Sequence, residues 1–150
     1  MENKNFLEII EYAIEKENEA IDFYTELKMN EKLPNVIKVL DDIINMEKGH
    51  INRLNMLRTS GPVSIDKIEM RSMNLSDYYE EQLSYDNLDY ISLLRIAMKR
   101  EDQAKKLYLD LANYTTDTDI RNLFLLLSSE EDQHKALFEE IYQDYVLVNN

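Results

Sequence analysis

The sequence predicts an all-α protein, a four-helix bundle built from two antiparallel helix hairpins. Glycine and proline are rare, with two of each in 150 residues, which argues against a fold of short strands and tight turns. Apolar residues make up 44% of the chain and charged residues 31%, a mixture that favours a compact domain over disorder. Four segments also carry apolar residues at intervals of three and four, the spacing of one face of an α-helix.

These periodic segments define the four expected helices, which run over about 5–29, 34–58, 87–113 and 118–145. At the start of the first, Asn5 and Glu8 have the spacing of a capping box. Pro34 suits the first turn of the second helix, because its ring already holds the helical backbone angle. The stretch TSGP, residues 59–62, is expected to end this helix.

The second hairpin is bounded by polar turn sequences. The third helix is expected to follow SYDN, residues 84–87, and the fourth to begin at the end of TTDT, residues 115–118. Residues 59–85 then form a crossover between the hairpins, within which residues 75–83 form either a short helix or an extended arm. Fully extended, the crossover reaches roughly 90 Å, well beyond the ~37 Å length of a helix of about 25 residues. It can therefore pass from one end of the bundle to the other.

Composition and charge exclude several classes of protein. The net charge of −13 and the absence of clustered Lys and Arg argue against nucleic acid as a partner. No apolar run approaches the ~18 residues of a membrane span, and the N-terminus lacks the pattern of a signal peptide. We therefore expect a cytoplasmic protein with no membrane partner. Because the chain has no cysteine, it has no disulfide, thiolate metal site or iron–sulfur cluster.

Two glutamates interrupt the apolar stripes of the first and third helices. Glu17 falls in the apolar series of the first helix, and Glu101 falls in that of the third. A glutamate on a core-facing stripe is costly unless it is paired or bound to a cation. The alternative for either residue alone is a position at the edge of the stripe, where the carboxylate reaches solvent.

An internal repeat links these glutamates to the only histidines in the chain. The sequence ENEAIDFY, which starts at Glu17, matches EDQAKKLY, which starts at Glu101, with an offset of 84 residues. The same offset relates two Glu-x-x-His pairs. Glu47 corresponds to Glu131, and His50 corresponds to His134. Because both halves carry the same set, the pattern favours one shared site.

Hairpin geometry places these side chains at one height. The midpoint of positions 17 and 47 is 32, and that of 101 and 131 is 116; both lie in expected turns. In an antiparallel pair, residues equidistant from the turn lie side by side, here ~22 Å from each turn at 1.5 Å per residue. Each histidine follows its glutamate by three residues and so shares its face. Six side chains are therefore expected to meet in the middle of the bundle.

Four carboxylates and two neutral imidazoles match the charge of two divalent cations. In the expected arrangement Glu47 and Glu131 bridge the two ions, while Glu17 with His50 and Glu101 with His134 each hold one. Oxygen and imidazole donors without sulfur suit Fe(II) or Mn(II) better than structural zinc. We therefore expect two iron ions per chain, with manganese or a mixed iron and manganese pair as alternatives.

With these residues, the chain resembles the ferritin-like di-iron carboxylate proteins, and among them the rubrerythrin-type domain. The resemblance implies one ferritin-like domain over residues 1–150 and an oxidoreductase that reduces hydrogen peroxide or dioxygen at a dinuclear non-haem iron site. It also implies a homodimer. The chain lacks the four-cysteine rubredoxin module of rubrerythrins proper, so we expect a separate electron donor. Rubrerythrins resemble one another in a further glutamate one turn after the third-helix ligand, where this chain has Ala104.

Two tyrosines and three acidic residues lie near the six expected ligands. Tyr24 and Tyr108 follow Glu17 and Glu101 by seven residues, so each is either a packed core residue or a donor to a ligand carboxylate. Three acidic neighbours of the motifs lack acidic partners in the repeat and are expected on the solvated face: Glu19, Glu130 and Asp132.

Three functions remain open at this level. The first is a peroxidase-like or oxidase-like enzyme, in which two ferrous ions supply two electrons to a small oxidant. The second is a non-catalytic iron protein, such as a carrier, store or sensor, or a ferroxidase. The third is a bundle that retains the motif without metal, against which the intact pattern in both halves argues.

Overall fold

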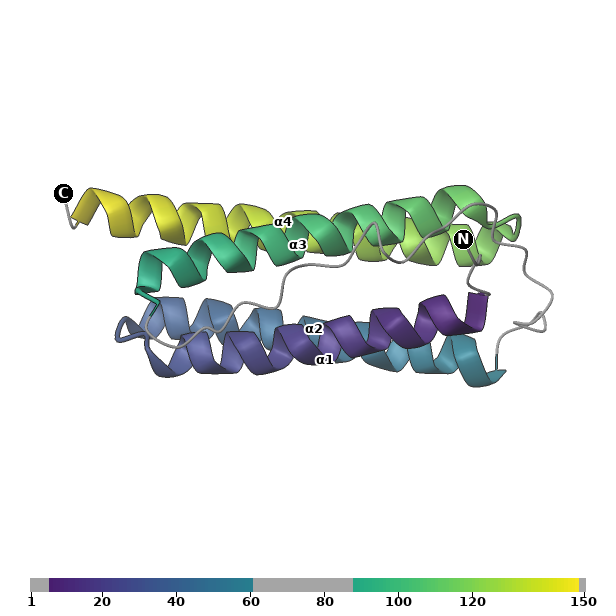
Figure 1. The fold of residues 1–150 in the computed structure, drawn as a ribbon, viewed down its shortest axis with the longest axis horizontal. Coiled ribbons are helices and arrows are strands. Elements are labelled where there is room, and N and C mark those ends of the chain that lie inside the picture. The colour runs from purple at the N-terminus through teal and green to yellow at the C-terminus, as the bar shows by residue number, and fades with distance from the viewer. Residues whose placement is uncertain (1–5, 61–87, 149–150) are drawn as a thin grey trace.

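The computed structural model describes residues 6–60 and 88–148, and in this part of the chain the regular structure is entirely helical. The four helices are α1 (Phe6–Met29), α2 (Pro34–Ser60), α3 (Tyr90–Tyr114) and α4 (Thr118–Val148). Helices α1 and α2 form one antiparallel hairpin, and α3 and α4 form the other (Figure 1). The predicted four-helix bundle is confirmed.

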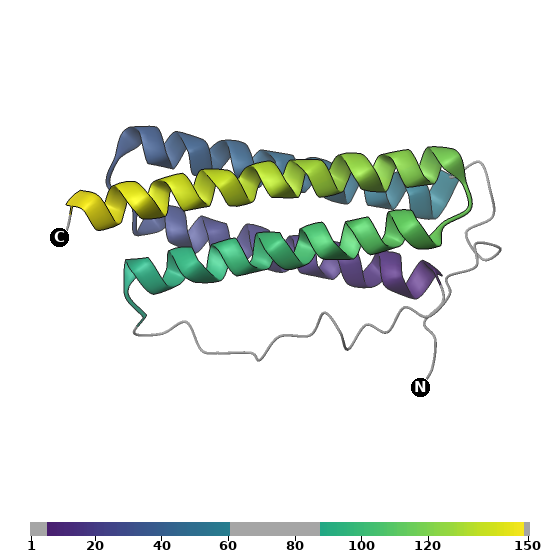
Figure 2. The ribbon, with the colours of Figure 1, turned by 90° about the horizontal axis from the view of Figure 1, so that it is seen from above.

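The two hairpins lie along each other over most of their length (Figure 2). Helix α2 ends at one end of the bundle, whereas α3 begins at the opposite end (Figure 1). A crossover that spans the length of the bundle is therefore required, as expected from the sequence. Most of residues 59–85, including the expected arm at 75–83, lie outside the described residues, as does Asn5 of the expected capping box.

Helix α3 begins at Tyr90 rather than at the expected residue 87. Asp89 is its N-cap, with extended backbone angles of φ −75° and ψ 167°. The Asp89 carboxylate accepts a hydrogen bond of 2.8 Å from the backbone N–H of Ser92. An N-cap residue has non-helical backbone angles and lies just before the helix, so the first helical residue is Tyr90, directly after Asp89.

Helices α2 and α4 end later than expected. Helix α2 continues through Thr59, whose hydroxyl donates to the carbonyl of Asn55 over 2.9 Å and is thereby satisfied within the helix. Helix α4 runs to Val148 rather than to residue 145. Its last turns are held by packing, because the Tyr145 ring lies 5.0 Å from that of Tyr90 between centroids.

The turn between α3 and α4 is fixed by side chains that satisfy the free backbone groups at both helix ends. Asp117 accepts a hydrogen bond of 3.0 Å from the N–H of Ile120, which caps α4. The Arg121 guanidinium donates to the carbonyls of Ala112 and Thr115 over 3.2 and 3.0 Å. These contacts set the relative height of α3 and α4.

The apolar core consists of two clusters separated by a polar layer. Along α1, Ala13 belongs to the first cluster and Ala20 to the second; along α4, Leu127 and Phe138 are divided in the same way. In each helix, the buried charged residues and histidines lie between the residues of the two clusters: Glu17, Glu47, His50, Glu101, Glu131 and His134. The middle of the bundle is therefore a layer of ionisable groups with apolar packing above and below it.

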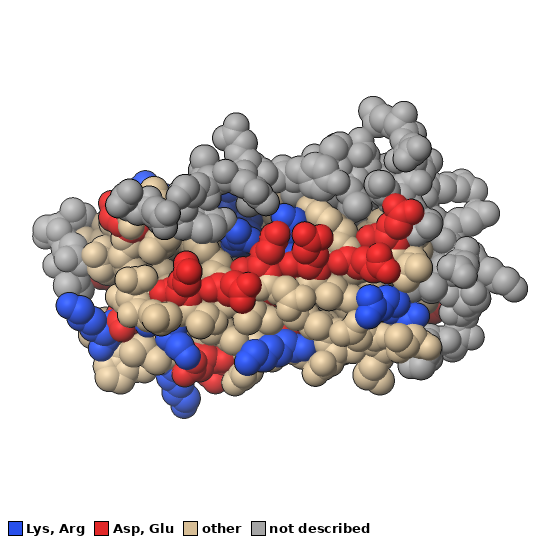
Figure 3. Space-filling model, turned by 60° about the horizontal axis from the view of Figure 1, so that its bottom comes forward, with Lys and Arg blue, Asp and Glu red and all other residues tan. Residues whose placement is uncertain are grey.

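Other acidic residues lie on the surface. Figure 3 shows acidic side chains gathered in a row on the face of the molecule formed by α1 and α2. Exposed acidic residues of α1 recur at helical spacing: Glu11, Glu15, Asp22 and Glu26. Solvation accounts for these residues, so the buried glutamates are the ones that call for an explanation.

None of the helices that the structure describes combines the length and the apolar character needed to cross a membrane. The cytoplasmic location expected from the sequence stays a prediction.

Gly49 offers a test of helix packing beside the polar layer. A methyl group at this position, inside α2, would meet no atom within 4 Å. We therefore expect Gly49→Ala to raise the free energy of unfolding by about 0.5–1 kcal/mol, because alanine loses less backbone entropy in a helix. Urea unfolding of the metal-free protein measures the change.

The matched control is Gln133→Ala, at the equivalent exposed position 84 residues later in α4. This surface change should alter the free energy of unfolding by less than about 0.5 kcal/mol. A destabilised Gly49→Ala protein would show that the backbone between Glu47 and His50 does not tolerate a side chain.

Candidate metal centre

The structure brings together all six residues that the sequence pattern selects. One of them comes from α1, one from α3 and two each from α2 and α4, and each is at most 3% exposed. Their ligand atoms form two groups, and the atoms of each group lie within 4.8 Å of one another. The first group is Glu17, Glu47, His50 and Glu131; the second is Glu47, Glu101, Glu131 and His134. Glu47 and Glu131 belong to both groups, as expected of bridging residues.

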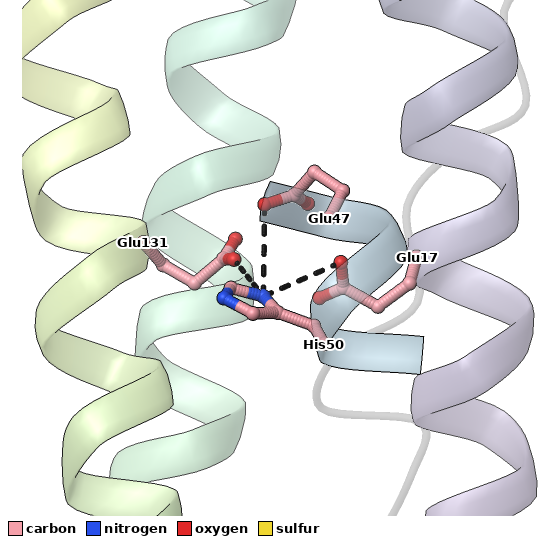
Figure 4. Close-up of side chains that lie close together, drawn as sticks. All are labelled: Glu17, Glu47, His50 and Glu131. Carbon is pink, nitrogen blue, oxygen red and sulfur yellow. Dashed lines mark ion pairs between the residues drawn. The ribbon is translucent and has the colours of Figure 1, made fainter. Parts of the chain in front are cut away.

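In the first group, three carboxylates approach one nitrogen of His50 (Figure 4). The His50 Nδ1 lies 2.8 Å from Glu131 Oε1 and 3.6 Å from Glu17 Oε2. Glu47 Oε1, one turn earlier on the same helix, is also 3.6 Å from this nitrogen. The convergence of groups from three helices on one point is the geometry of a cation site.

The second group repeats this arrangement around the other histidine. The Nδ1 of His134 lies 3.0 Å from Glu47 Oε1 and 3.6 Å from Glu101 Oε2. The two imidazole rings are nearly parallel, with centroids 6.1 Å apart. The two halves of the chain therefore contribute equivalent groups to adjacent positions.

Each of the six residues directs one atom into the layer that has no hydrogen-bond partner. Among the described residues these buried atoms are Glu17 Oε2, Glu47 Oε1, His50 Nδ1, Glu101 Oε2, Glu131 Oε1 and His134 Nδ1. Buried polar atoms in native proteins nearly always make hydrogen bonds, so six atoms in one layer that make none, and that have ion-pair contacts only with one another, are exceptional. A cation at each group would be a partner for all of them. The donor set therefore fits two metal ions.

Burial makes the negative charge of Glu47 and Glu131, the two residues common to both groups, costly without metal. It raises the pKa of Glu47 well above its ordinary value, and the charges of Glu17 and Glu101 raise it further. The pKa of Glu131 is raised in the same way, first by burial and then by the charges of Glu101 and Glu17. In the metal-free protein, these two carboxyl groups bind protons at pH values where exposed glutamates are ionised.

Glu17 and His50 behave as an ion pair. Burial acts to raise the pKa of Glu17, but hydrogen bonding with His50, Glu47 and Tyr108 and the charge of His50 together outweigh it, so the pKa lies below its ordinary value. For His50, burial acts to lower the pKa, while Glu17 and the other nearby carboxylates raise it overall. Protons and this pair thus neutralise part of the layer when no metal is bound.

The two tyrosines donate hydrogen bonds to ligand carboxylates across the bundle. Tyr24 of α1 donates to Glu101 Oε1 of α3 over 2.6 Å, and Tyr108 of α3 donates to Glu17 Oε1 of α1 over 2.7 Å. Burial, followed by the carboxylate charge, raises the pKa of each tyrosine well above its ordinary value. Both hydroxyls therefore stay protonated and hold their glutamates in place.

The expectation that Glu130 is a solvated residue is wrong. Its side chain is 16% exposed, and its Oε2 lies 2.7 Å from His50 Nε2, on the side of the ring opposite the metal group. No spacing in the sequence indicates this contact, because Glu130 and His50 are 80 residues apart on different helices. By contrast, Asp132 lies on the surface as expected and pairs with Lys105.

A small cavity of about 50 Å³ reaches the layer between α1 and α3. Glu17, Glu47 and Glu131 contribute to its lining, together with the small side chain of Ala104 and the basic residue Arg100. A single water needs roughly 10–15 Å³ of such space, whereas drug-sized ligands occupy pockets of roughly 300–1,000 Å³. The cavity therefore suits a diatomic or peroxide-sized molecule.

The comparison with known families agrees with this geometry. The model of the rubrerythrin family matches residues 8–142, which include every residue of both groups. The chain belongs to the rubrerythrin family. No curated protein and no solved structure matches the chain. Membership in this family supports a di-iron site in the polar layer, since these proteins are ferritin-like di-iron proteins.

The pKa directions predict how the stability of the metal-free rubrerythrin-family protein depends on pH. Glu47, Glu131 and His50 have raised pKa values, so they stabilise the fold below their ordinary values and lose that contribution as pH rises through the raised ones. Glu17, with a lowered pKa, contributes fully above its ordinary value of 4.5 and adds no slope at neutral pH. We expect the free energy of unfolding to fall as pH rises above 6.5, the ordinary value of histidine.

Thermal unfolding in the presence of a chelator, across the neutral and mildly alkaline range, measures this dependence. The metal-loaded protein is the control and should show a much flatter profile, because cations replace the protons. The gain in Tm on adding metal should therefore grow with pH. A metal-free protein that becomes more stable over the same range would contradict the assignment of protons to the bridging pair.

Proposed function

We propose that this rubrerythrin-family protein holds two iron ions in the polar layer and reduces hydrogen peroxide to water, with dioxygen as the alternative oxidant. The observation that supports the proposal is the set of six buried ligand atoms without hydrogen-bond partners. Glu17 and His50 would hold one ion, Glu101 and His134 the other, and Glu47 and Glu131 would bridge them. Four carboxylates balance the charge of two divalent cations.

The reaction requires one electron pair. Hydrogen peroxide, two protons and two electrons give two molecules of water. Two bound ferrous ions that each give up one electron supply that pair together, and a separate reductant must return it. Because the chain has no cysteine, no iron–sulfur cluster or rubredoxin-type centre within it can serve as this donor.

The protein would hold the ligand residues in position and offers a small cavity beside them. Tyr24 and Tyr108 hold the two terminal glutamates through their hydroxyl groups. The cavity between α1 and α3 is small and is lined in part by Glu47 and Glu131. Its size supports an oxidant such as peroxide or dioxygen rather than an organic substrate.

The proposal also covers the identity of the metal, the assembly of the protein and an alternative function. The oxygen and nitrogen donor set suits iron, and it also suits manganese or a mixed pair. The homodimer is implied by likeness to related proteins. A non-catalytic iron carrier, store or sensor, or a ferroxidase, is the alternative function, and Ala104 in the cavity wall favours it by leaving out the further glutamate of rubrerythrins.

Metal stoichiometry is the first test of the proposal. Anaerobic titration with Fe(II) should show two equivalents bound per chain, because two groups of ligand atoms are present. Glu47→Ala or Glu131→Ala should weaken both positions, since each residue belongs to both groups, whereas Glu17→Ala should mainly weaken one.

Glu15→Ala, which removes an exposed glutamate from the same helix as Glu17, is the control and should bind two equivalents. An endpoint at zero or one equivalent in the unaltered protein would rule out the dinuclear site. Equal metal content in the bridging and terminal variants would instead count against the assignment of bridges.

The choice of oxidant is the second test. We expect the reduced protein to be oxidised faster by hydrogen peroxide than by dioxygen, because peroxide reduction is the activity that the resemblance to rubrerythrins implies and two adjacent ferrous ions can pass both electrons to peroxide together. Stopped-flow oxidation of the diferrous protein by each oxidant at matched concentration measures the ratio of rates. Ala104→Glu should increase the preference for peroxide, and Ala104→Ser, which adds no carboxylate, should leave it nearly unchanged. Faster oxidation by dioxygen would replace the peroxidase with an oxidase or ferroxidase.

A further inference from the structure

The two halves of the polar layer differ in what lies behind each histidine. The outward nitrogen of His50, Nε2, lies 2.7 Å from Glu130 Oε2. The outward nitrogen of His134 lies 3.5 Å from the Met46 sulfur. Met46 and Glu130 occupy equivalent positions of the 84-residue repeat, each directly before the glutamate of its Glu-x-x-His pair. One histidine therefore has a carboxylate behind it, and the other has a thioether.

The other hydrogen bonds that the structure describes at the six ligand residues are matched between the halves. Tyr24 donates to Glu101 over 2.6 Å, and its counterpart Tyr108 donates to Glu17 over 2.7 Å. Because these two tyrosine bonds are equivalent, the two halves differ in hydrogen bonding at Met46 and Glu130, the residues that contact the outward nitrogens of the histidines. A difference between the two metal positions can thus be traced to a single pair of residues.

The chemistry of the two contacts is unequal. A histidine that binds a cation through Nδ1 carries its proton on Nε2 and donates that proton outward. A carboxylate accepts this proton in a short, charge-assisted hydrogen bond, which makes the imidazole a stronger electron donor to the metal. A thioether sulfur is a weak acceptor without charge, so it gives His134 little of this support.

Exposure adds to the difference. The Glu130 side chain is 16% exposed, so water screens its charge only in part. Met46, at 37% exposed, adds no charge to its half of the layer. At this pair of equivalent positions, the group around His50 therefore has a negative charge that the group around His134 lacks.

On the basis of the proposed dinuclear site, we infer that its two positions are inequivalent: the position of His50, supported by Glu130, takes up a divalent cation first and holds it more tightly than the position of His134. Glu130 acts as a positioning residue, since it contacts the imidazole and not the ion. The His134 position is then the one from which an ion exchanges, and the one at which a second kind of metal enters a mixed pair.

Partial loading tests the inference without any variant. Crystals of the full chain loaded with one equivalent of Co(II), a probe that resists oxidation by air, give the occupancy of each position by anomalous diffraction. The inference predicts a stronger peak beside His50 than beside His134. Equal peaks, or a stronger peak beside His134, would overturn it while leaving the dinuclear site intact. The absence of metal from both groups at full loading would overturn the site itself and the inference with it.

Substitutions then test whether Glu130 causes the difference. Glu130→Gln keeps the shape and removes the charge, and we expect the first Co(II) binding constant to fall by about 10–100-fold. Met46→Glu should strengthen the second step and bring the two constants closer together. Combining Glu130→Met with Met46→Glu exchanges the two supports and should move the stronger peak at one equivalent to His134.

The matched control is Asp132→Asn, which removes one charge from the same helix at a residue that is 55% exposed and contacts Lys105. It should leave both binding constants within about twofold, because exposed charges are screened by solvent. An equal loss of affinity in Asp132→Asn and Glu130→Gln would mean that overall charge, and not the contact with His50, sets the affinity, and would overturn the inference.

Discussion

The fold is organised around the burial of four carboxylates in the middle of its core. Each ion taken out of water without compensation carries a penalty of several kcal/mol, while the whole stability of a domain is only about 5–15 kcal/mol. Glu17, Glu47, Glu101 and Glu131 therefore cannot all remain charged and uncompensated in a folded chain. In the metal-free protein, protons on the bridging pair and the charge of His50 supply part of the compensation. Two divalent cations would supply all of it, and would also become partners for the six buried atoms that make no hydrogen bond.

Much of the remaining architecture serves to place this layer. Two apolar clusters enclose it from both ends, so that the folding energy of the bundle keeps the ligand atoms together even without metal. The Asp117 cap and the Arg121 hydrogen bonds fix the turn that sets Glu101 level with Glu131. The cross-bundle bonds of Tyr24 and Tyr108 tie each hairpin to a ligand of the other. The proposed redox activity requires this rigidity, since a ligand set that opened readily would lose its ions.

The fold and the convergence of the six expected ligand residues could be predicted from the sequence because each left a regular signal. Glu17 and Glu101 interrupt apolar stripes, and the offset of 84 residues connects them to the two Glu-x-x-His pairs. Bundle topology follows from equal distances to the turns. The role of Glu130 could not be predicted, since it depends on a contact between α2 and α4 that no spacing along one helix encodes. Helix ends were missed for a related reason: the cap at Asp89 and the packing of Tyr145 on Tyr90 are decided by local hydrogen bonding and tertiary contact rather than by periodicity. The reaction itself is least accessible, because the same donor set serves a peroxidase, an oxidase and an iron carrier.

X-ray absorption at the iron edge, on protein loaded anaerobically with Fe(II), tests most directly whether the layer is a dinuclear metal centre. Such a centre has only oxygen and nitrogen neighbours in its first shell, together with iron–iron scattering at roughly 3.5–4 Å, the usual separation in two-metal sites. We expect this result because Glu47 and Glu131 belong to both groups of ligand atoms. Iron that shows no metal–metal scattering would mean that the ions bind singly, and would contradict the account of why these carboxylates are buried together.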